Sequence, residues 1–345
     1  MKKILLVILV VIVILLLIDL LPNRTTGDKT ALGGVYELRK MELGCYKQSV
    51  LIRGFDRNNP IVVFLHGGPG YASISYIKAF QKEIEKNFVV VNWDQRGGGQ
   101  SFSLSLDKKS MTEEQLLEDL DGLIDSLCSE FGKDKVYLVG HSWGTVLGKD
   151  YAQKHPEKLK YYIGIGQCVS ADASDEYTYP ILLAEAEKRN DQKALKKLKK
   201  AGNPPYSGLL GEAVTLRKYI NKYDGNEINV NTSMEMLKST IFEPEYSFID
   251  LLRLFIGSYY SIAHLYPEYK GRDFRTESLE FDIPVLFIMG KNDLVTNHFL
   301  AKDYFNIIKA PQKDFILFDN SGHEPYIEDP HKFSEILKEC QKSEY

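Results

Sequence analysis

The chain has few of the residues and patterns that mark several classes of protein. Its 345 residues include only four cysteines and two tryptophans, and the formal net charge is −4. Nucleic-acid-binding domains are usually strongly basic, so this charge gives no support for such a partner. The sequence also lacks the His-Glu-x-x-His and paired Cys-x-x-Cys spacings of zinc sites. We therefore predict no nucleic-acid partner, no metal and no cofactor.

The cysteines are scattered rather than grouped, at positions 45, 128, 168 and 340. In an oxidising compartment, four cysteines can pair fully in three ways, whereas in a reducing one they remain free. None of them lies in a glycine-flanked turn between a strand and a helix. The sequence therefore does not predict a cysteine nucleophile.

One long apolar run stands out at the N-terminus. Residues 4–18 are apolar without interruption, and Lys2 and Lys3 precede them. A membrane-spanning helix needs about 20 apolar residues, with a range that starts near 17, and no small-residue cleavage site follows this run. We expect a transmembrane anchor within residues 1–21 and a polar linker over 22–34. Lysines before the span favour a cytoplasmic N-terminus, which places the main domain outside the cytoplasm. A cleaved signal segment, which would give a secreted protein, is the alternative.

Beyond the linker, strand patterns alternate with helix patterns. The alternation extends over residues 35–170 and again over 276–345, and it predicts a mostly parallel sheet with helices on both faces. Thr112 and Gln115, for example, have the spacing of a capping box that opens a helix. Residues 171–275 are rich in charge, tyrosine and helix-forming residues and show no clear strand. We predict a helical cap there, over the carboxyl edge of the sheet, where open α/β folds bind ligands.

The most informative motif is Gly-His-Ser-Trp-Gly, at residues 140–144. It follows an apolar strand at residues 136–139 and leads into a helical pattern. In this setting, a glycine-x-serine-x-glycine turn holds the serine clear of the sheet edge, where it can act as a nucleophile. Ser142 is therefore the predicted nucleophile. The alternative is an ordinary strand-to-helix loop with a buried serine.

A second glycine-rich turn, His-Gly-Gly-Pro-Gly at residues 66–70, follows another apolar strand. In sites of this kind, the oxyanion is bound by the backbone N–H after the nucleophile and by a loop after an earlier strand. The sequence thus predicts backbone donors at Trp143, Gly67 and Gly68. Glycines suit this loop because their bare backbone can approach a substrate carbonyl closely.

The acid and the base are predicted from the two strands that follow the cap. One apolar strand leads to Asp293 just past its end, and the next leads to His323 in a turn. Among the chain's seven histidines, His323 is the one in a loop after a strand and after the acid. The order serine, acid, histidine is typical of a triad built on such a sheet. Asp282 and Asp319 are rival acids, but the first precedes its strand and the second lies very near His323.

A third motif, Asp-Gln-Arg-Gly-Gly-Gly-Gln-Ser, occupies residues 94–101. Within it, we expect Asp94 and Arg96 to hold the loops through an ion pair or hydrogen bonds. Together the three motifs resemble the proline iminopeptidase branch of the α/β-hydrolases. The resemblance implies the α/β-hydrolase fold and release of N-terminal residues, chiefly proline. It also implies the same serine, aspartate and histidine, with backbone donors at Gly68 and Trp143.

These enzymes bind the substrate's free amine through glutamates in a cap that carries a tryptophan-rich motif. Here both tryptophans, Trp93 and Trp143, lie in the predicted core. The amine-binding glutamates therefore cannot be assigned by motif. By their position in the cap alone, the candidates are Glu185, Glu187, Glu243 and Glu245.

The sequence thus predicts a serine hydrolase that acts through an acyl-enzyme on a short peptide or another small molecule. The first expectation is an aminopeptidase that releases N-terminal proline or a similar residue. A carboxylesterase or small-amide hydrolase is the alternative, because the cap lacks the tryptophan motif. A non-catalytic binding protein on the same fold is a further alternative, which the complete serine, aspartate and histidine set disfavours.

Overall fold

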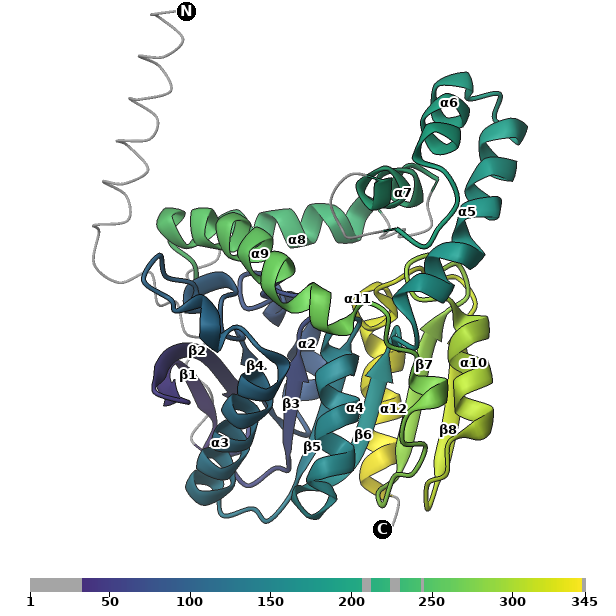
Figure 1. The fold of residues 1–345 in the computed structure, drawn as a ribbon. Helices are drawn as coiled ribbons and strands as arrows, with labels where there is room; N and C mark the ends of the chain where they lie inside the picture. The colour runs from purple at the N-terminus through teal and green to yellow at the C-terminus, as the bar shows by residue number, and fades with distance from the viewer. Residues whose placement is uncertain (1–32, 207–211, 224–229, 243–244, 343–345) are drawn as a thin grey trace, which may run out of the picture.

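The computed structural model describes residues 33–206, 212–223, 230–242 and 245–342. These residues form an eight-stranded sheet with helices on both faces and a further group of helices above one edge (Figure 1). The strands, in chain order, are β1 (Val35–Leu43), β2 (Tyr46–Gly54), β3 (Ile61–Leu65), β4 (Val89–Trp93), β5 (Val136–His141), β6 (Leu159–Ile165), β7 (Val285–Gly290) and β8 (Lys313–Phe318).

The spatial order of the strands is β1-β2-β4-β3-β5-β6-β7-β8. The β1–β2 and β2–β4 pairs are antiparallel, and all the other pairs are parallel. The prediction of a mostly parallel sheet is therefore confirmed. Because parallel strands end at the same edge, the loops after β3, β5, β7 and β8 meet there.

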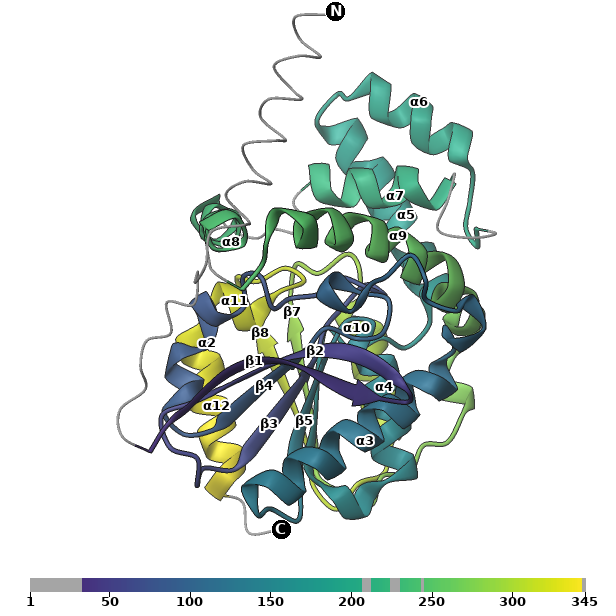
Figure 2. The same ribbon diagram turned by 90° about the vertical axis from the view of Figure 1, so that its left-hand side faces the viewer.

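The core helices form two layers, one on each face of the sheet (Figure 2). One layer contains α2 (Lys78–Glu85) and α12 (Pro330–Lys342), and the other contains α3 (Glu113–Phe131), α4 (Gly144–Lys154) and α10 (His298–Ile307). The prediction of helices on both faces is confirmed.

The central strands are rich in apolar residues because both of their faces are covered. In β3, Val62 and Phe64 pack in the cluster that includes α2 and α12, whereas Ile61, Val63 and Leu65 pack in the cluster that includes α3 and α4. All five side chains are buried. Successive side chains of a strand point to opposite faces, which explains this division.

The ends of α3 follow from its local sequence. The Thr112 hydroxyl accepts a hydrogen bond from the Gln115 N–H at 3.2 Å, so the predicted N-cap bond is present. The helix ends at Phe131 because Gly132 has a φ of 62°, a left-handed conformation that glycine adopts without strain.

Between β6 and β7, the described chain is helical. This insert lies above one edge of the sheet (Figure 1). Its helices are α5 (Ala171–Lys188), α6 (Gln192–Ala201), α7 (Glu212–Lys222), α8 (Val230–Phe242) and α9 (Phe248–Tyr269). We refer to this insert, with the loops between its helices, as the cap.

Hydrogen bonds fasten the cap to the loops of the core. The Thr178 hydroxyl on α5 donates to the Leu294 carbonyl at 2.9 Å, in the loop after β7. The Ser258 hydroxyl on α9 donates to the Gly70 carbonyl at 2.9 Å, in the loop after β3. The cap therefore lies directly over the edge at which those strands end.

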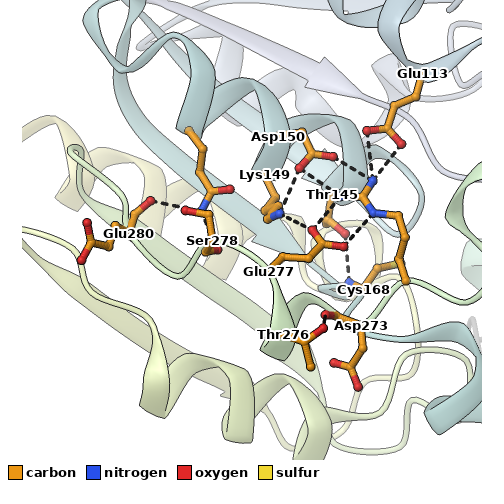
Figure 3. Close-up of polar contacts among 12 residues, drawn as sticks. Glu113, Thr145, Lys149, Asp150, Cys168, Asp273, Thr276, Glu277, Ser278 and Glu280 are labelled. Atoms are coloured by element: carbon orange, nitrogen blue, oxygen red, sulfur yellow. Dashed lines mark hydrogen bonds and ion pairs between the residues drawn. The ribbon is translucent and has the colours of Figure 1, made fainter.

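An ion-pair network holds the chain where it returns from the cap to the core. Arg272 follows α9 and lies 2.8 Å from Glu113, 2.9 Å from Asp150 and 2.7 Å from Glu277. Lys149 contacts Asp150 and Glu277 as well, at 3.0 and 2.7 Å (Figure 3). The network joins α3 and α4 to the segment that leads into β7, so it fixes the second half of the sheet against the first.

The predicted N-terminal anchor, residues 1–21, lies outside the described residues, as does most of the linker. Among the residues that the structure describes, no helix is both long enough and apolar enough to cross a bilayer. The anchor therefore stays a prediction. All four cysteines are described and free, and Cys168 and Cys340 are buried.

Candidate active site

Ser142 lies in a sharp turn between β5 and α4. Its φ is +51°, in the left-handed region that residues with a side chain rarely adopt. The two flanking glycines permit this turn, because a side chain at either would collide with backbone. A Cβ at Gly140 would meet the Gly144 carbonyl, and a Cβ at Gly144 would meet the Leu65 carbonyl. The glycine-x-serine-x-glycine spacing is thus a packing requirement of this strand-to-helix turn.

Hydrogen bonds hold the Ser142 turn against the neighbouring strand. The Ser142 N–H donates to the Ile165 carbonyl at the end of β6, at 2.9 Å, and the Thr145 N–H donates to the Ser142 carbonyl at 2.8 Å. The Thr145 hydroxyl also accepts from the Cys168 N–H at 2.9 Å. The backbone of the turn is therefore fixed on both sides.

The two predicted oxyanion elements lie close to the serine. Trp143 is buried and is the N-cap residue of α4, where unpaired N–H groups and the helix dipole favour an anion. Gly67 lies so near that a Cβ on it would be 3.3 Å from the Ser142 Cβ. Gly68 has a φ of +121°, which only glycine adopts readily. The structure thus brings both glycine-rich turns together at one point.

Asp293 and His323 form a buried pair. Asp293 lies after β7 and His323 after β8, and Oδ2 of the aspartate is 2.7 Å from Nδ1 of the histidine. The carboxylate also accepts hydrogen bonds from the Val295 and Thr296 N–H groups, at 2.7 and 2.9 Å, and from the Thr296 hydroxyl at 2.7 Å. These bonds fix the carboxylate, so it can orient the imidazole.

The two rival acids lie elsewhere. Asp282 is exposed and precedes β7. Asp319 is exposed and pairs with Lys291 at 3.2 Å. Neither contacts His323 in the described structure, whereas Asp293 does.

Burial and mutual attraction act in opposite directions on the charges of this pair. Burial is the largest single effect and raises the pKa of Asp293, but the charge and hydrogen bond of His323 and the hydrogen bonds of Thr296 together outweigh it and hold the pKa below its ordinary value. For His323, burial lowers the pKa, and the charge and hydrogen bond of Asp293 outweigh this effect and raise it. The aspartate therefore stays ionised and stabilises a proton on the histidine.

The other two histidines near the site are neutral and structural. Burial lowers the pKa of His66 to about 4 and that of His141 to about 3. The His66 Nε2 accepts from the Gln95 N–H at 3.1 Å, which ties the loop after β3 to the loop after β4. His66 thus has a structural role at the first glycine-rich turn.

One partly buried acid next to the site was not predicted from the sequence. Glu324 directly follows His323, and its Oε2 lies 3.3 Å from Nε2 of His141. Burial raises its pKa to about 7. Its position beside the predicted base was the signal available in the sequence.

Asp94 and Arg96 hold loops, as expected, but through separate networks. The Asp94 carboxylate accepts from the Tyr246 hydroxyl in the cap and from the Gln100 N–H, the latter at 3.0 Å. The Arg96 guanidinium donates to both oxygens of Asp119, at 2.7 and 2.8 Å. An ion pair between Asp94 and Arg96 is therefore not the arrangement, because each has a nearer partner.

The structure places the candidate amine-binding glutamates as follows. Glu185 pairs with Lys188 and Arg189 at the end of α5, and Glu187 is exposed on the same helix. Glu245 is buried and contacts Lys78 at 2.6 Å and the Tyr36 hydroxyl at 2.5 Å. Glu243 lies outside the described residues. Glu245 thus already neutralises a buried cation, whereas Glu185 forms exposed pairs at the surface.

The fold and this site define a class of protein. Residues 60–330 match the family model described as alpha/beta hydrolase fold. The chain therefore belongs to the α/β-hydrolase family, and it is a hydrolase of the branch that includes the proline iminopeptidases, as the sequence motifs indicated.

Three similar proteins support this placement. The chain is 32% identical over 302 residues to "Probable aminopeptidase YbaC" of Bacillus subtilis (strain 168), which covers 87% of this chain and 94% of that protein. It is 26% identical over 293 residues to the proline iminopeptidase of Heyndrickxia coagulans, and this match covers 84% of this chain and 93% of that protein. The crystal structure of the Mycobacterium smegmatis proline iminopeptidase has a TM-score of 0.66 at 18% identity, over 89% of this chain and 98% of that one, which shows a shared fold.

Proposed function

We propose that this hydrolase is a serine enzyme acting through an acyl-enzyme, and that it releases N-terminal proline or a similar residue from short peptides. The observation that carries the mechanism is the 2.7 Å contact of Asp293 with His323. The strained φ of Ser142 and the two glycine-rich turns support it. The names of the relatives support the peptide substrate.

In this proposal, His323 Nε2 takes the Ser142 proton while the serine oxygen attacks the substrate carbonyl. Asp293 holds the Nδ1 proton, which leaves Nε2 free as the base and stabilises the imidazolium that forms. The N–H groups of Trp143 and of Gly67 and Gly68 bind the oxyanion. The imidazolium then protonates the leaving amine, and water releases the acyl group by the same route.

A second candidate function is a carboxylesterase or small-amide hydrolase. It is favoured by the state of the buried cap glutamate, since Glu245 is already neutralised by Lys78. An ester substrate without a free amine would need no acidic partner in the cap. A non-catalytic binding protein remains the third candidate.

Hydrolysis assays on the full chain separate these candidates. We expect cleavage of proline-p-nitroanilide, no cleavage of its N-acetyl form, and no activity in Ser142→Ala. Turnover of only p-nitrophenyl acetate and butyrate would replace the aminopeptidase with an esterase. Failure of a fluorophosphonate to label the wild-type chain, with no turnover of any substrate, would leave the binding protein.

We also propose that the N-terminal segment anchors the enzyme with its hydrolase domain outside the cytoplasm. Residues 4–18 and the two lysines before them support this orientation. We expect the full chain to stay with membranes after alkaline carbonate extraction and its domain to be digested by protease added to intact cells. Recovery of a shortened chain from the medium would instead identify a cleaved signal segment and a secreted enzyme.

A further inference from the structure

Arg217 has one guanidinium nitrogen without a hydrogen-bond partner among the described residues. It lies on α7, and its Nη2 donates to Asp175 Oδ1 on α5 at 3.0 Å. Its other terminal nitrogen, Nη1, is buried and has no hydrogen-bond partner among the residues that the structure describes. Arg217 as a whole is partly open, with 29% of its side chain exposed, whereas Asp175 is buried. A buried donor of this kind is costly unless an acceptor reaches it.

The helix that carries this arginine packs near the loop after β7, because its Leu216 and Ile220 belong to the hydrophobic cluster that Leu294 and Val295 contact. Asp175 lies one helical turn before Thr178, and Thr178 is bonded to the Leu294 carbonyl at 2.9 Å. Leu294 directly follows Asp293. The residue that orients Arg217 is therefore fixed to the loop that supplies the acid of the site.

The positive charge of Arg217 affects the pKa values of two groups in the loops of the site. For the His323 pKa, burial and Asp293 have the larger effects, and Arg217 adds a smaller lowering effect. Burial raises the pKa of Tyr71, next to Gly70, and Arg217 opposes that rise. Tyr71 lies in the loop after β3 and His323 in the loop after β8, so the charge of Arg217 acts on loops from two strands of the site.

We propose that Arg217 binds the free carboxylate of the substrate, and that the preferred substrates are dipeptides whose C-terminal carboxylate lies one residue beyond the scissile bond. This inference rests on the proposed hydrolase function and deepens it. A guanidinium is a planar fork that matches a carboxylate, and Asp175 already fixes one of its edges. Asp175 also offsets part of the positive charge, which suits a monoanion better than a phosphate dianion.

The test compares Pro-Gly with Pro-Gly-amide, which differ only in the terminal charge. We expect the wild-type chain to show a kcat/KM about 10- to 100-fold higher for Pro-Gly, the value of a charge-assisted hydrogen bond. Arg217→Gln should lose this preference and keep the activity on the amide. Lys218→Gln, an exposed neighbour on the same helix, should behave as the wild type. Equal rates in the wild type, or an unchanged preference in Arg217→Gln, would overturn the proposal.

Two further measurements apply if the wild type cleaves no proline substrate or if Arg217→Gln does not fold. If the wild type cleaves no proline substrate, the aminopeptidase proposal has failed, and the inference is tested on 4-acetoxybenzoate against 4-acetoxybenzamide. Here a preference for the carboxylate that Arg217→Gln abolishes supports it, and equal rates refute it. If Arg217→Gln does not fold, Arg217→Lys keeps the cation but removes the fork. Its ratio of kcat/KM for the carboxylate substrate over the amide should be less than one tenth of the wild-type ratio. A ratio equal to that of the wild type would contradict a bidentate carboxylate contact.

Discussion

His141 and His323 are joined through one hydrogen bond, in which Nε2 of His141 lies 2.9 Å from the carbonyl oxygen of His323. A carbonyl only accepts, so Nε2 of His141 carries the proton. Burial keeps this ring neutral, because it lowers the pKa to about 3. The residue before the nucleophile thus holds the backbone of the proposed base.

We expect His141→Ala to lower kcat about 10-fold with little change in KM, because the loop that carries His323 loses its hydrogen bond and the base is misplaced. His141→Gln keeps an N–H donor at a similar reach and should recover most of the loss. Steady-state kinetics on both variants checks this. Equal losses in the two variants would show that the donor does not position His323.

The activity should fall at low pH with a midpoint above the ordinary histidine value of about 6.5. His323 accepts a proton only when it is neutral, and Asp293 raises the His323 pKa. In Asp293→Asn the midpoint should move to lower pH, and kcat should drop by about 10⁴-fold because the tautomer is no longer fixed. The measurement is the pH profile of kcat/KM. A midpoint that does not move would mean that another group controls it.

The buried Lys78–Glu245 pair, with nitrogen and oxygen 2.6 Å apart, should stabilise the position of the cap. Lys78→Met leaves a buried carboxylate without its cation, and we expect a loss of about 3 kcal/mol in the free energy of unfolding. The double variant Lys78→Met/Glu245→Gln should be more stable than Lys78→Met alone, because it buries no charge.

Urea unfolding of the single and double variants measures this coupling. The matched control is Lys86→Met, which removes an exposed pair with Glu83 and should cost under about 1 kcal/mol. If Lys78→Met cost no more than this control, the pair would contribute nothing beyond a surface contact.

Gly144→Ala should destabilise the fold by about 2–4 kcal/mol, because its Cβ would collide with the Leu65 carbonyl at the Ser142 turn. Gly122→Ala is the control, since the nearest atom to its Cβ would be Leu43 Cδ2 at 3.9 Å. Gly122 lies within α3, where alanine is favoured over glycine by about 1 kcal/mol. Thermal unfolding should therefore show a lower Tm for Gly144→Ala and a higher Tm for Gly122→Ala. A Gly144→Ala chain with the wild-type Tm would show that the turn can relax.

Local sequence was sufficient where a structural requirement lies within a few residues. The apolar run of β3, the N-cap at Thr112 and the glycines around Ser142 each express a constraint of one strand, helix or turn, and each was predicted. The positions of Asp293 and His323 could also be predicted, because each residue follows an apolar strand.

The partners of the cap glutamates could not be predicted from the local sequence. Glu245 is 167 residues from Lys78 in the chain, and the pairing depends on how the cap packs on α2. Position in the cap alone could not show that this carboxylate was already neutralised. The same holds for Glu324, whose burial comes from the packing of its loop against His141.

By itself, the sequence determined the strands, the two glycine-rich turns and the residue types of the site, because these follow from backbone geometry and from the spacing of apolar residues along the chain. Only the tertiary structure decided which charges meet outside the predicted triad, as in Lys78 with Glu245 and Arg217 with Asp175. The reason is that an ion pair depends on distances of a few ångströms between side chains on different elements, and packing of the whole fold sets those distances.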